Sequence, residues 1–306
     1  MGIRILKGGM MTTVQDLGRT GYQSQGFSVS GVMDVRSFKI ANLLLDNPEN
    51  EAVLEFTLIG PTLEFTSETI IAITGGDFRP QINGKPAKMY TAIYMHRGDI
   101  LTFGGARTGT RGYIAFSSYL DVPVVMGSRS TNIKCQIGGF KGRKLEDEDY
   151  IAFRAKRRYL PYYLSRSLDL DEFDQEKITL RVVMGPQEKM FTKEGRETFL
   201  NSEYTVTSEF DRMGCRLEGP FIAYKTTSDI ISDGIAFGSV QVPSHGKPII
   251  LLADRQTTGG YAKIATVVSV DIPKLVQRKT EQKVRFQAVS VEEAQKLLAD
   301  EMKELN

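Results

Sequence analysis

Short apolar stretches separated by glycine turns fill the chain from residue 52 onward. They are brief and partly alternating, as in Ala52–Phe56, Thr69–Thr74 and Gly112–Phe116. Turn sequences such as Asn83-Gly84 separate them. Runs this short and this often interrupted are typical of antiparallel strands, because a helix needs a longer periodic segment. The pattern predicts a barrel or a sandwich.

The second half of the chain repeats this pattern. Ile178–Met184 and Ile264–Val270 are predicted strands, and glycine turns again lie between such runs. A few helices complete the prediction. One is expected at Val35–Asp46, one at Thr192–Leu200 and one from Ser290 to the C-terminus. Asp34, Thr192 and Ser290 can cap the first turns of these helices. We therefore predict a mainly β protein with two β-barrel halves and a few short helices.

The chain length bears on the number of domains. A chain of 306 residues usually forms two domains or one elaborate one. We predict two, covering residues 1–165 and 166–306, with the boundary in a charged connector at Tyr159–Lys177. Under this interpretation the boundary is not sharp, and a segment of one half can form part of the other domain.

Charge and composition exclude several classes of partner. Lys and Arg number 39 against 37 Asp and Glu, so no general field attracts nucleic acid or an anionic membrane. No apolar run approaches the length that spans a bilayer. The only cysteines, Cys135 and Cys215, form no close pair, and two histidines are too few for a histidine-rich metal site. We expect a cytoplasmic protein with no resident metal.

The densest polar stretch is Asp254–Tyr261, directly after the predicted buried strand Pro248–Ala253. It holds an acid, an arginine, an amide, two hydroxyls and two glycines. Thr12–Tyr22 near the N-terminus uses similar residue types in a different order. Because glycine lets a backbone approach a ligand closely, both stretches are candidate site segments, and ordinary turns are the alternative.

Arginine next to aspartate recurs in these segments. The planar arginine side chain binds a carboxylate or phosphate through two hydrogen bonds, and a neighbouring aspartate can orient it or act as a base. For a single pair we favour a structural ion pair, and for the set we favour a site. The predicted catalytic residues are Asp16, Arg19, Arg129, Arg212, Asp254 and Arg255. The predicted substrate-binding residues are Gln15, Tyr22, Ser130, Thr131, Gln241, Gln256, Thr257, Thr258, Gly259, Gly260 and Tyr261.

Several motifs together resemble one family. They are Thr12–Tyr22, Gly127–Thr131, Asp211–Gly214, Gln241–Pro243 and Asp254–Tyr261, and they follow that family's order along nearly the whole chain. The family is the carboxyltransferase family named after the second subunit of allophanate hydrolase. It includes the carboxyltransferase part of urea carboxylase, the C subunit of the ATP-dependent 5-oxoprolinase, and a protein that antagonises a sporulation-kinase inhibitor.

The resemblance implies two cyclophilin-like β-barrel domains with the site between them, and it implies a function. Within the family we rank the 5-oxoprolinase C subunit first, as part of an ATP-dependent lactam hydrolase that also contains an A subunit and an inhibitor-like B subunit. ATP with Mg²⁺ would then act in the complex. A biotin-dependent carboxyltransferase that uses carboxybiotin and an amide or urea-like acceptor is the alternative, and a regulator that binds the B subunit is the second. A homo-oligomer is compatible with each.

Two common kinds of active site have no counterpart in the sequence. Neither His96 nor His245 lies in a polar constellation that would mark the base of a serine hydrolase. A Gly-x-x-x-x-Gly-Lys-Ser/Thr loop for phosphates is also missing from the sequence. We therefore expect the chain to be nearly inactive without its partner proteins.

Overall fold

The computed structural model describes residues 1–156, 160–168 and 173–305. The chain divides into two compact units. The first consists of Met1–Thr20 and Ser30–Asp174, and the second of Gly21–Val29 and Gln175–Asn306. A short segment near the N-terminus thus belongs to the second unit. Part of the connector predicted at residues 159 to 177 lies outside the described residues, and the domain boundary predicted there stays a prediction.

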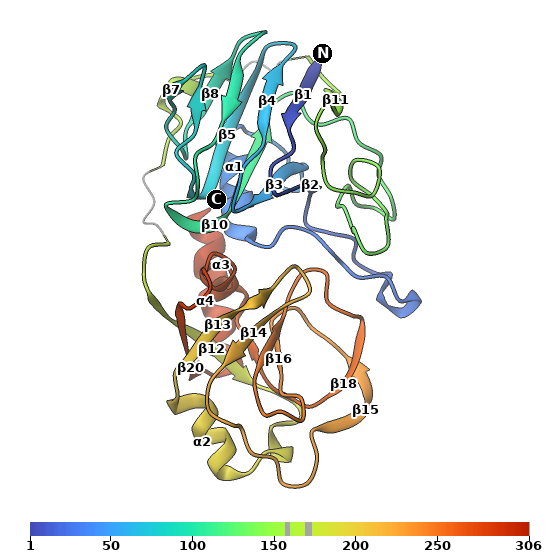
Figure 1. Cartoon of the computed structure of the whole chain (residues 1–306), viewed down its shortest axis with the longest axis vertical. Helices are drawn as coiled ribbons and strands as arrows, with labels where there is room; N and C mark the ends of the chain where they lie inside the picture. The colour runs from blue at the N-terminus through green and yellow to red at the C-terminus, as the bar shows by residue number, and fades with distance from the viewer. Residues whose placement is uncertain (157–159, 169–172, 306) are drawn as a thin grey trace. The chain divides into compact units, whose positions relative to one another are not determined.

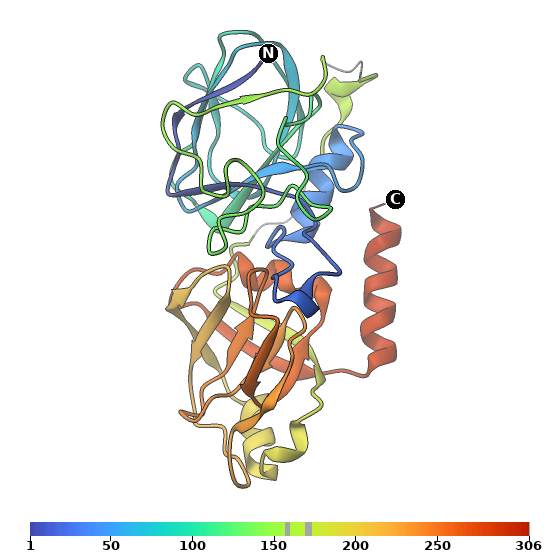
Figure 2. The same ribbon diagram turned by 90° about the vertical axis from the view of Figure 1, so that its right-hand side faces the viewer.

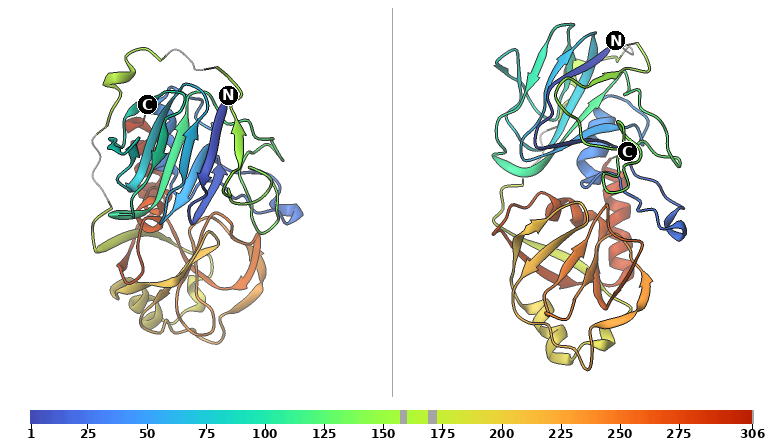
Figure 3. Two further views of the ribbon diagram at one scale, coloured as in Figure 1. Left: turned by 45° about the horizontal axis from the view of Figure 1, so that its top comes forward. Right: turned by 45° about the vertical axis from the view of Figure 1, so that its right-hand side comes forward.

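The first unit contains two antiparallel sheets around one apolar core (Figure 1). Six strands in the order β11-β1-β4-β9-β6-β7 form one sheet, and five in the order β2-β3-β10-β5-β8 form the other. The blue and green strands of both sheets can be followed in Figure 3. The strands are β1 (Gly2–Lys7), β2 (Met11–Gln15), β3 (Val53–Thr57), β4 (Thr62–Phe65), β5 (Thr69–Asp77), β6 (Gln81–Ile82), β7 (Lys85–Pro86), β8 (Ala92–Met95), β9 (Ile100–Thr102), β10 (Thr108–Phe116) and β11 (Tyr150–Ala152).

Aromatic rings fill the centre of this core. The rings of Phe56 on β3 and Phe78 pack edge to face with their centroids 4.7 Å apart, and the Phe103 ring lies 4.7 Å from the Phe56 ring. Gly112 on β10 is required beside them, because a Cβ there would lie 2.2 Å from the Phe56 ring. Fully burying a side chain such as Phe56 contributes about 1.5–3 kcal/mol to folding.

The first helix covers part of the five-stranded sheet. Helix α1 (Val35–Leu44) packs on β5 and β10. Its start is set by Asp34, whose Oδ1 atom accepts a hydrogen bond from the Ser37 backbone N–H at 2.9 Å. An N-terminal cap of this kind contributes about 1 kcal/mol to helix stability. The helix predicted after Asp34 is confirmed. A 3₁₀ turn, η2 (Tyr163–Ser165), lies later in the unit.

The second unit is built on a closed barrel in the strand order β12-β19-β16-β17-β14-β13-β20. β20 closes it by pairing parallel with β12 and antiparallel with β13. A separate two-stranded ribbon, β15 with β18, lies beside the barrel in Figure 1. The strands are β12 (Lys177–Met184), β13 (Tyr204–Phe210), β14 (Gly214–Glu218), β15 (Asp229–Gly234), β16 (Ser239–Gln241), β17 (Ile249–Leu251), β18 (Thr258–Tyr261), β19 (Lys263–Val267) and β20 (Lys283–Ala288).

The helices of this unit lie outside its barrel. Both longer ones begin at predicted caps, since Thr192 accepts from the Gly195 N–H and Ser290 forms a capping box with Glu293. Figure 2 shows the terminal helix standing clear of the barrel, and none of its residues is buried. The helical segments are η1 (Gln23–Gln25), η3 (Glu188–Met190), α2 (Lys193–Asn201), η4 (Ser269–Asp271), α3 (Ile272–Val276) and α4 (Val291–Glu304).

The predicted mainly β class is confirmed, and the closed barrel makes up the core of the second unit. In the first unit the strands form two separate sheets. None of the helices described is both long and apolar enough to cross a bilayer.

Candidate functional site

A cavity of about 540 Å³ lies on the outer face of the barrel in the second unit. Its floor is a row of residues in register across three strands. Arg216 on β14 lies opposite Ile249 on β17, which lies opposite Gln241 on β16. Residues paired in this way point to the same face of a sheet. Because Arg216 stands between the buried Cys215 and Leu217, the alternation of the strand turns it outward to the cavity.

The ribbon residues Gly259, Gly260 and Tyr261 form another wall of the cavity. Gly259 approaches the floor closely, because a Cβ built on it would lie 2.7 Å from the Gln241 Nε2 atom. Gln241 also donates from Nε2 to the Tyr261 carbonyl oxygen at 3.3 Å. The predicted glycine pair therefore brings the ribbon close to the amide on the cavity floor.

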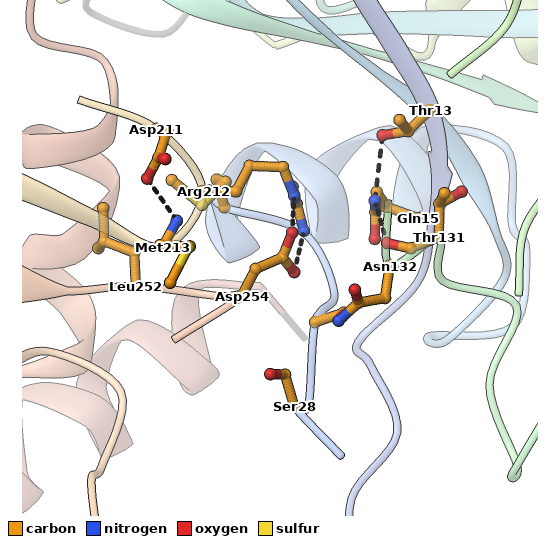
Figure 4. Close-up of polar contacts among 12 residues, drawn as sticks. Thr13, Gln15, Ser28, Thr131, Asn132, Asp211, Arg212, Met213, Leu252 and Asp254 are labelled. Carbon is orange, nitrogen blue, oxygen red and sulfur yellow. Dashed lines mark hydrogen bonds and ion pairs between the residues drawn. The ribbon is translucent and has the colours of Figure 1, made fainter. Parts of the chain in front are cut away.

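The turn between β13 and β14 closes one end of the cavity. Asp211 shapes it by accepting hydrogen bonds at Oδ1 from the backbone N–H groups of Met213 (2.7 Å) and Gly214 (3.1 Å), the first of which is drawn in Figure 4. Asp211, Met213 and Gly214 all line the cavity. The predicted Asp211–Gly214 motif is thus a fixed turn in the cavity wall.

Arg212, in the same turn, binds Asp254 from the other polar stretch (Figure 4). The Arg212 Nε atom lies 2.9 Å from Asp254 Oδ2, and Nη2 lies 3.3 Å from Oδ1. The backbone joins as well, since the Asp254 N–H donates to the Arg212 carbonyl at 2.8 Å. Two segments predicted separately from the sequence are therefore joined by a two-point ion pair.

Arg255 uses its guanidinium to hold backbone. Its Nε and Nη1 atoms donate to the carbonyl oxygens of Ile235 and Leu252, each at 3.1 Å, and the group lies over the Phe237 ring. Burial lowers the pKa of this guanidinium, and neighbouring Asp254 opposes that shift. These contacts favour a structural role for Arg255, and its predicted catalytic role stays a prediction.

The exchanged segment Gly21–Val29 also contacts this loop. Ser28 donates from Oγ to the Arg255 carbonyl oxygen at 2.8 Å. Tyr22, a predicted substrate-binding residue, precedes η1 in this segment, and its carbonyl accepts hydrogen bonds from Gln25 and Phe27. The segment therefore helps to fix the loop that carries Arg255.

The remaining residues of the stretch divide by position. Gln256 lines the cavity. The Thr257 carbonyl accepts a hydrogen bond from the Ile235 N–H, and Thr258 pairs with Gly234 at the end of the ribbon. Half of the predicted residues in Asp254–Tyr261 thus face the cavity, namely Gln256, Gly259, Gly260 and Tyr261, whereas the others hold the loop in place.

A second polar cluster lies in the first unit around Asp16. Its carboxylate accepts hydrogen bonds from the hydroxyls of Ser128 and Ser130, both at 2.6 Å, from the Arg129 N–H at 2.6 Å and from the Gly18 N–H at 2.8 Å. Asp16 thereby ties the end of β2 to the loop that contains Gly127–Thr131. With so many donors on its two oxygens, Asp16 is arranged to position this loop.

Gln15 and Arg19 belong to the same cluster. Gln15 donates from Nε2 to Thr13 Oγ1 at 3.0 Å and to the Thr131 carbonyl at 3.1 Å, as Figure 4 shows. Its Oε1 atom is buried without a hydrogen-bond partner among the described residues. The Arg19 side chain is buried, and its Nη2 atom donates to the Ser130 carbonyl. The first unit thus gathers its predicted residues into one cluster, to which Arg129 contributes its backbone N–H.

Sequence reasoning did not select Arg216 or Glu209 as site residues, although both line the cavity. The Arg216 Nε atom lies 2.9 Å from Glu209 Oε2, and both side chains are well exposed. The available signal was the alternation Gly-Cys-Arg-Leu-Glu, which turns the arginine to the face opposite Cys215 and Leu217. The site that the family resemblance implies between the two domains stays a prediction.

Comparison with known proteins settles the family. The model of the carboxyltransferase domain, subdomain A and B, matches residues 25–288. The chain belongs to this carboxyltransferase family. Its recognition from the sequence motifs is confirmed.

Relatives of this carboxyltransferase-family chain include components of enzymes. It is 34% identical to the C subunit of 5-oxoprolinase from Escherichia coli, over 98% of this chain and 96% of that protein. The corresponding protein of Haemophilus influenzae is 34% identical over 93% of this chain and 90% of that protein. Urea amidolyase of Saccharomyces cerevisiae is 29% identical over 96% of this chain and 17% of that protein.

Solved structures agree with the family. The chain superimposes on the crystal structure of the K. lactis urea amidolyase with a TM-score of 0.93 and 28% identity, covering 100% of this chain and 20% of that one. For the Kluyveromyces lactis urea carboxylase the TM-score is 0.92, again with 28% identity, covering 100% of this chain and 29% of that one. This carboxyltransferase-family chain spans only a small part of those enzymes.

Proposed function

We propose that the chain is the C subunit of an ATP-dependent 5-oxoprolinase complex, which opens 5-oxo-L-proline to L-glutamate with hydrolysis of ATP. The observation that carries this is the 34% identity to the 5-oxoprolinase C subunit over nearly the whole of both chains. The urea amidolyase match covers a far smaller share of that protein. The A and B subunits of 5-oxoprolinase would be the partners.

The cavity of the second unit is chemically suited to a small cyclic amide that bears a carboxylate. Arg216 supplies a cation, and its ion pair with Glu209 joins side chains that are 48% and 71% exposed. Exposed pairs contribute about 1 kcal/mol or less, so a substrate carboxylate can replace Glu209 at little cost. Gln241 and Gln256 supply amides that can donate to the lactam oxygen and accept from its N–H.

The side-chain charges in the cavity do not favour a nucleoside triphosphate. Among the described residues that line it, Arg216 is the one cation, and Glu209 and Asp211 are two carboxylates. A triphosphate needs an excess of cationic or N–H donor groups around its oxygens. We therefore assign ATP with Mg²⁺ to the assembled complex, with no phosphate contact made by this cavity.

Within this scheme the residues of the chain bind and orient the substrate. Arg216 would hold the carboxylate, and the amides of Gln241 and Gln256 would fix the ring so that the lactam carbonyl faces its activating group. Holding reactants in one geometry removes several kcal/mol from a reaction barrier. The fixed Asp211 turn keeps this end of the cavity in place.

A biotin-dependent carboxyltransferase is the second candidate. It is favoured by the family model itself and by the urea amidolyase and urea carboxylase relatives, which align with this chain over nearly its entire length. The same cavity would then take a urea-like or amide acceptor, and carboxybiotin would deliver the carboxyl group. Gln241 and Gln256 suit either acceptor.

Reconstitution separates the two candidates. The chain would be purified with the A and B subunits from the same organism, and ATP hydrolysis and glutamate formation would be measured with 5-oxo-L-proline. We expect ATP hydrolysis that depends on 5-oxoproline and stops when this chain is omitted. In parallel, carboxyl transfer from carboxybiotin to urea would be assayed. Transfer to urea together with no response to 5-oxoproline would replace the first function with the second.

A further inference from the structure

The ribbon of β15 and β18 has little support of its own. Among the described residues β15 pairs with no strand except β18, and the pairing is interrupted between Asp229 and Asp233. Ile231, in this interruption, is 95% exposed, so its side chain is not packed against the described part of the chain. A two-stranded ribbon is marginally stable by itself. Contacts to the barrel must therefore hold it over the cavity.

One such contact is an ion pair between the barrel and the ribbon. Lys263 at the start of β19 places its Nζ atom 2.7 Å from Asp233 Oδ2 and 2.9 Å from the Gly234 carbonyl oxygen. Only 5% of the lysine side chain is exposed, against 53% for that of Asp233. Lys263 also lies opposite Gln241, so the row that forms the cavity floor continues to this ion pair.

Gln187 strengthens the connection between Lys263 and Asp233. It donates from Nε2 to Asp233 Oδ2 at 3.3 Å and accepts at Oε1 from the Lys263 N–H at 3.2 Å. Lys263 is the main cause that lowers the pKa of the Asp233 carboxyl. Within the described part of the chain, few other polar contacts cross from barrel to ribbon, the Gln241 bond to Tyr261 being one. The ribbon is therefore secured at a small number of places.

We propose that the β15–β18 ribbon is a movable cover of the cavity and that Lys263 is the positioning residue that keeps it closed through Asp233. Closing is favoured because a buried lysine loses its charged partner when the ribbon lifts. The ribbon can still open, because neither its edge nor Ile231 is packed in an apolar core that opening would disrupt. The inference rests on the function proposed above only for its choice of substrate.

The pair can be broken from its exposed side without disturbing the barrel. Asp233→Asn removes the charge at a half-exposed position, and Asp229→Asn on the same strand is the matched control, since Asp229 has no ion-pair partner among the described residues. Asp233→Glu keeps the negative charge, and its hydrogen exchange should stay close to that of the wild type. Hydrogen exchange followed by mass spectrometry would be measured on the purified chain for peptides covering 229–234, 258–261 and 264–267.

We expect Asp233→Asn to raise exchange in 229–234 and 258–261 by about fivefold to tenfold, with 264–267 unchanged. In the reconstituted complex the KM for 5-oxo-L-proline should rise several-fold with kcat nearly constant. Unchanged exchange in the ribbon overturns the inference, and so does an equal rise in the barrel peptide 264–267, which marks a merely structural pair. Because exchange is measured without substrate, it tests the cover even where the proposed function fails.

Discussion

Arg212 and Asp254 form a largely buried ion pair in the second unit, with the Arg212 Nε atom 2.9 Å from Asp254 Oδ2. The pair joins the turn that ends the cavity to the loop that leads into β18. A second contact joins the same side chains, with the Arg212 Nη2 atom 3.3 Å from Asp254 Oδ1. Both partners are thereby engaged in holding the two loops around the cavity.

Asp254→Asn should destabilise the protein. An asparagine keeps the shape but removes the negative charge from a mostly buried ion pair with Arg212, which costs about 2–4 kcal/mol of unfolding free energy. Urea unfolding of the purified chain measures this. Asp300→Asn on α4 is the control, because Asp300 forms an exposed pair with Lys303 at 3.3 Å. A normal unfolding free energy together with lost activity in the complex would restore the catalytic role for Asp254.

Arg255→Lys should also act on stability. Lysine cannot reach the Ile235 and Leu252 carbonyls in the same fixed geometry, and it loses the contact over Phe237. We expect a loss of about 1–2 kcal/mol and a nearly normal KM for 5-oxo-L-proline in the complex. Thermal melting together with steady-state kinetics distinguishes the two roles, since an unchanged melting temperature with activity reduced about tenfold would mean that Arg255 binds substrate.

The stability of the second unit should fall in acid partly through Asp271. Burial raises the pKa of this carboxyl, but hydrogen bonds from Arg181 and Lys274 outweigh burial and leave its pKa lowered. A carboxyl with a lower pKa in the folded state stabilises the fold above its unfolded pKa of about 3.9. That contribution is lost as pH falls through the folded value.

Asp271→Asn tests this pH dependence. The variant should lose about 2–4 kcal/mol at pH 7, and the difference from the wild type should shrink as pH falls below about 4. Urea unfolding at a series of pH values gives both curves. A difference that stays constant across the acid range would show that Asp271 stabilises the fold independently of its charge.

Local features of the fold were predictable from the sequence. The caps at Asp34, Thr192 and Ser290 act within one helical turn, so the residues that follow each cap are sufficient to predict them. Short apolar runs between glycine turns predicted strands for the same reason. Strand order is different, because it depends on partners far away along the chain, and the sequence did not separate a closed barrel from two sheets.

The candidate site shows the same division. The residue types around Asp16 suggested a polar cluster, but its contacts to Ser128 and Ser130 span more than a hundred positions, so the geometry that fixes the loop was not predictable. Arg216 was missed because its place beside Gln241 follows from the register of three strands. The assignment of Gly21–Val29 to the second unit also depends on distant contacts.

The most direct test compares Arg216→Gln with Arg285→Gln in the reconstituted complex. The two arginines are 48% and 50% exposed, and each pairs with a glutamate, but of the two only Arg216 lines the cavity. If Arg216 binds the substrate carboxylate, Arg216→Gln should raise the KM for 5-oxo-L-proline about tenfold or more, with melting temperatures of both variants near that of the wild type. Arg285→Gln should leave the KM unchanged. Equal KM values for the two variants and the wild type would contradict a substrate site in this cavity.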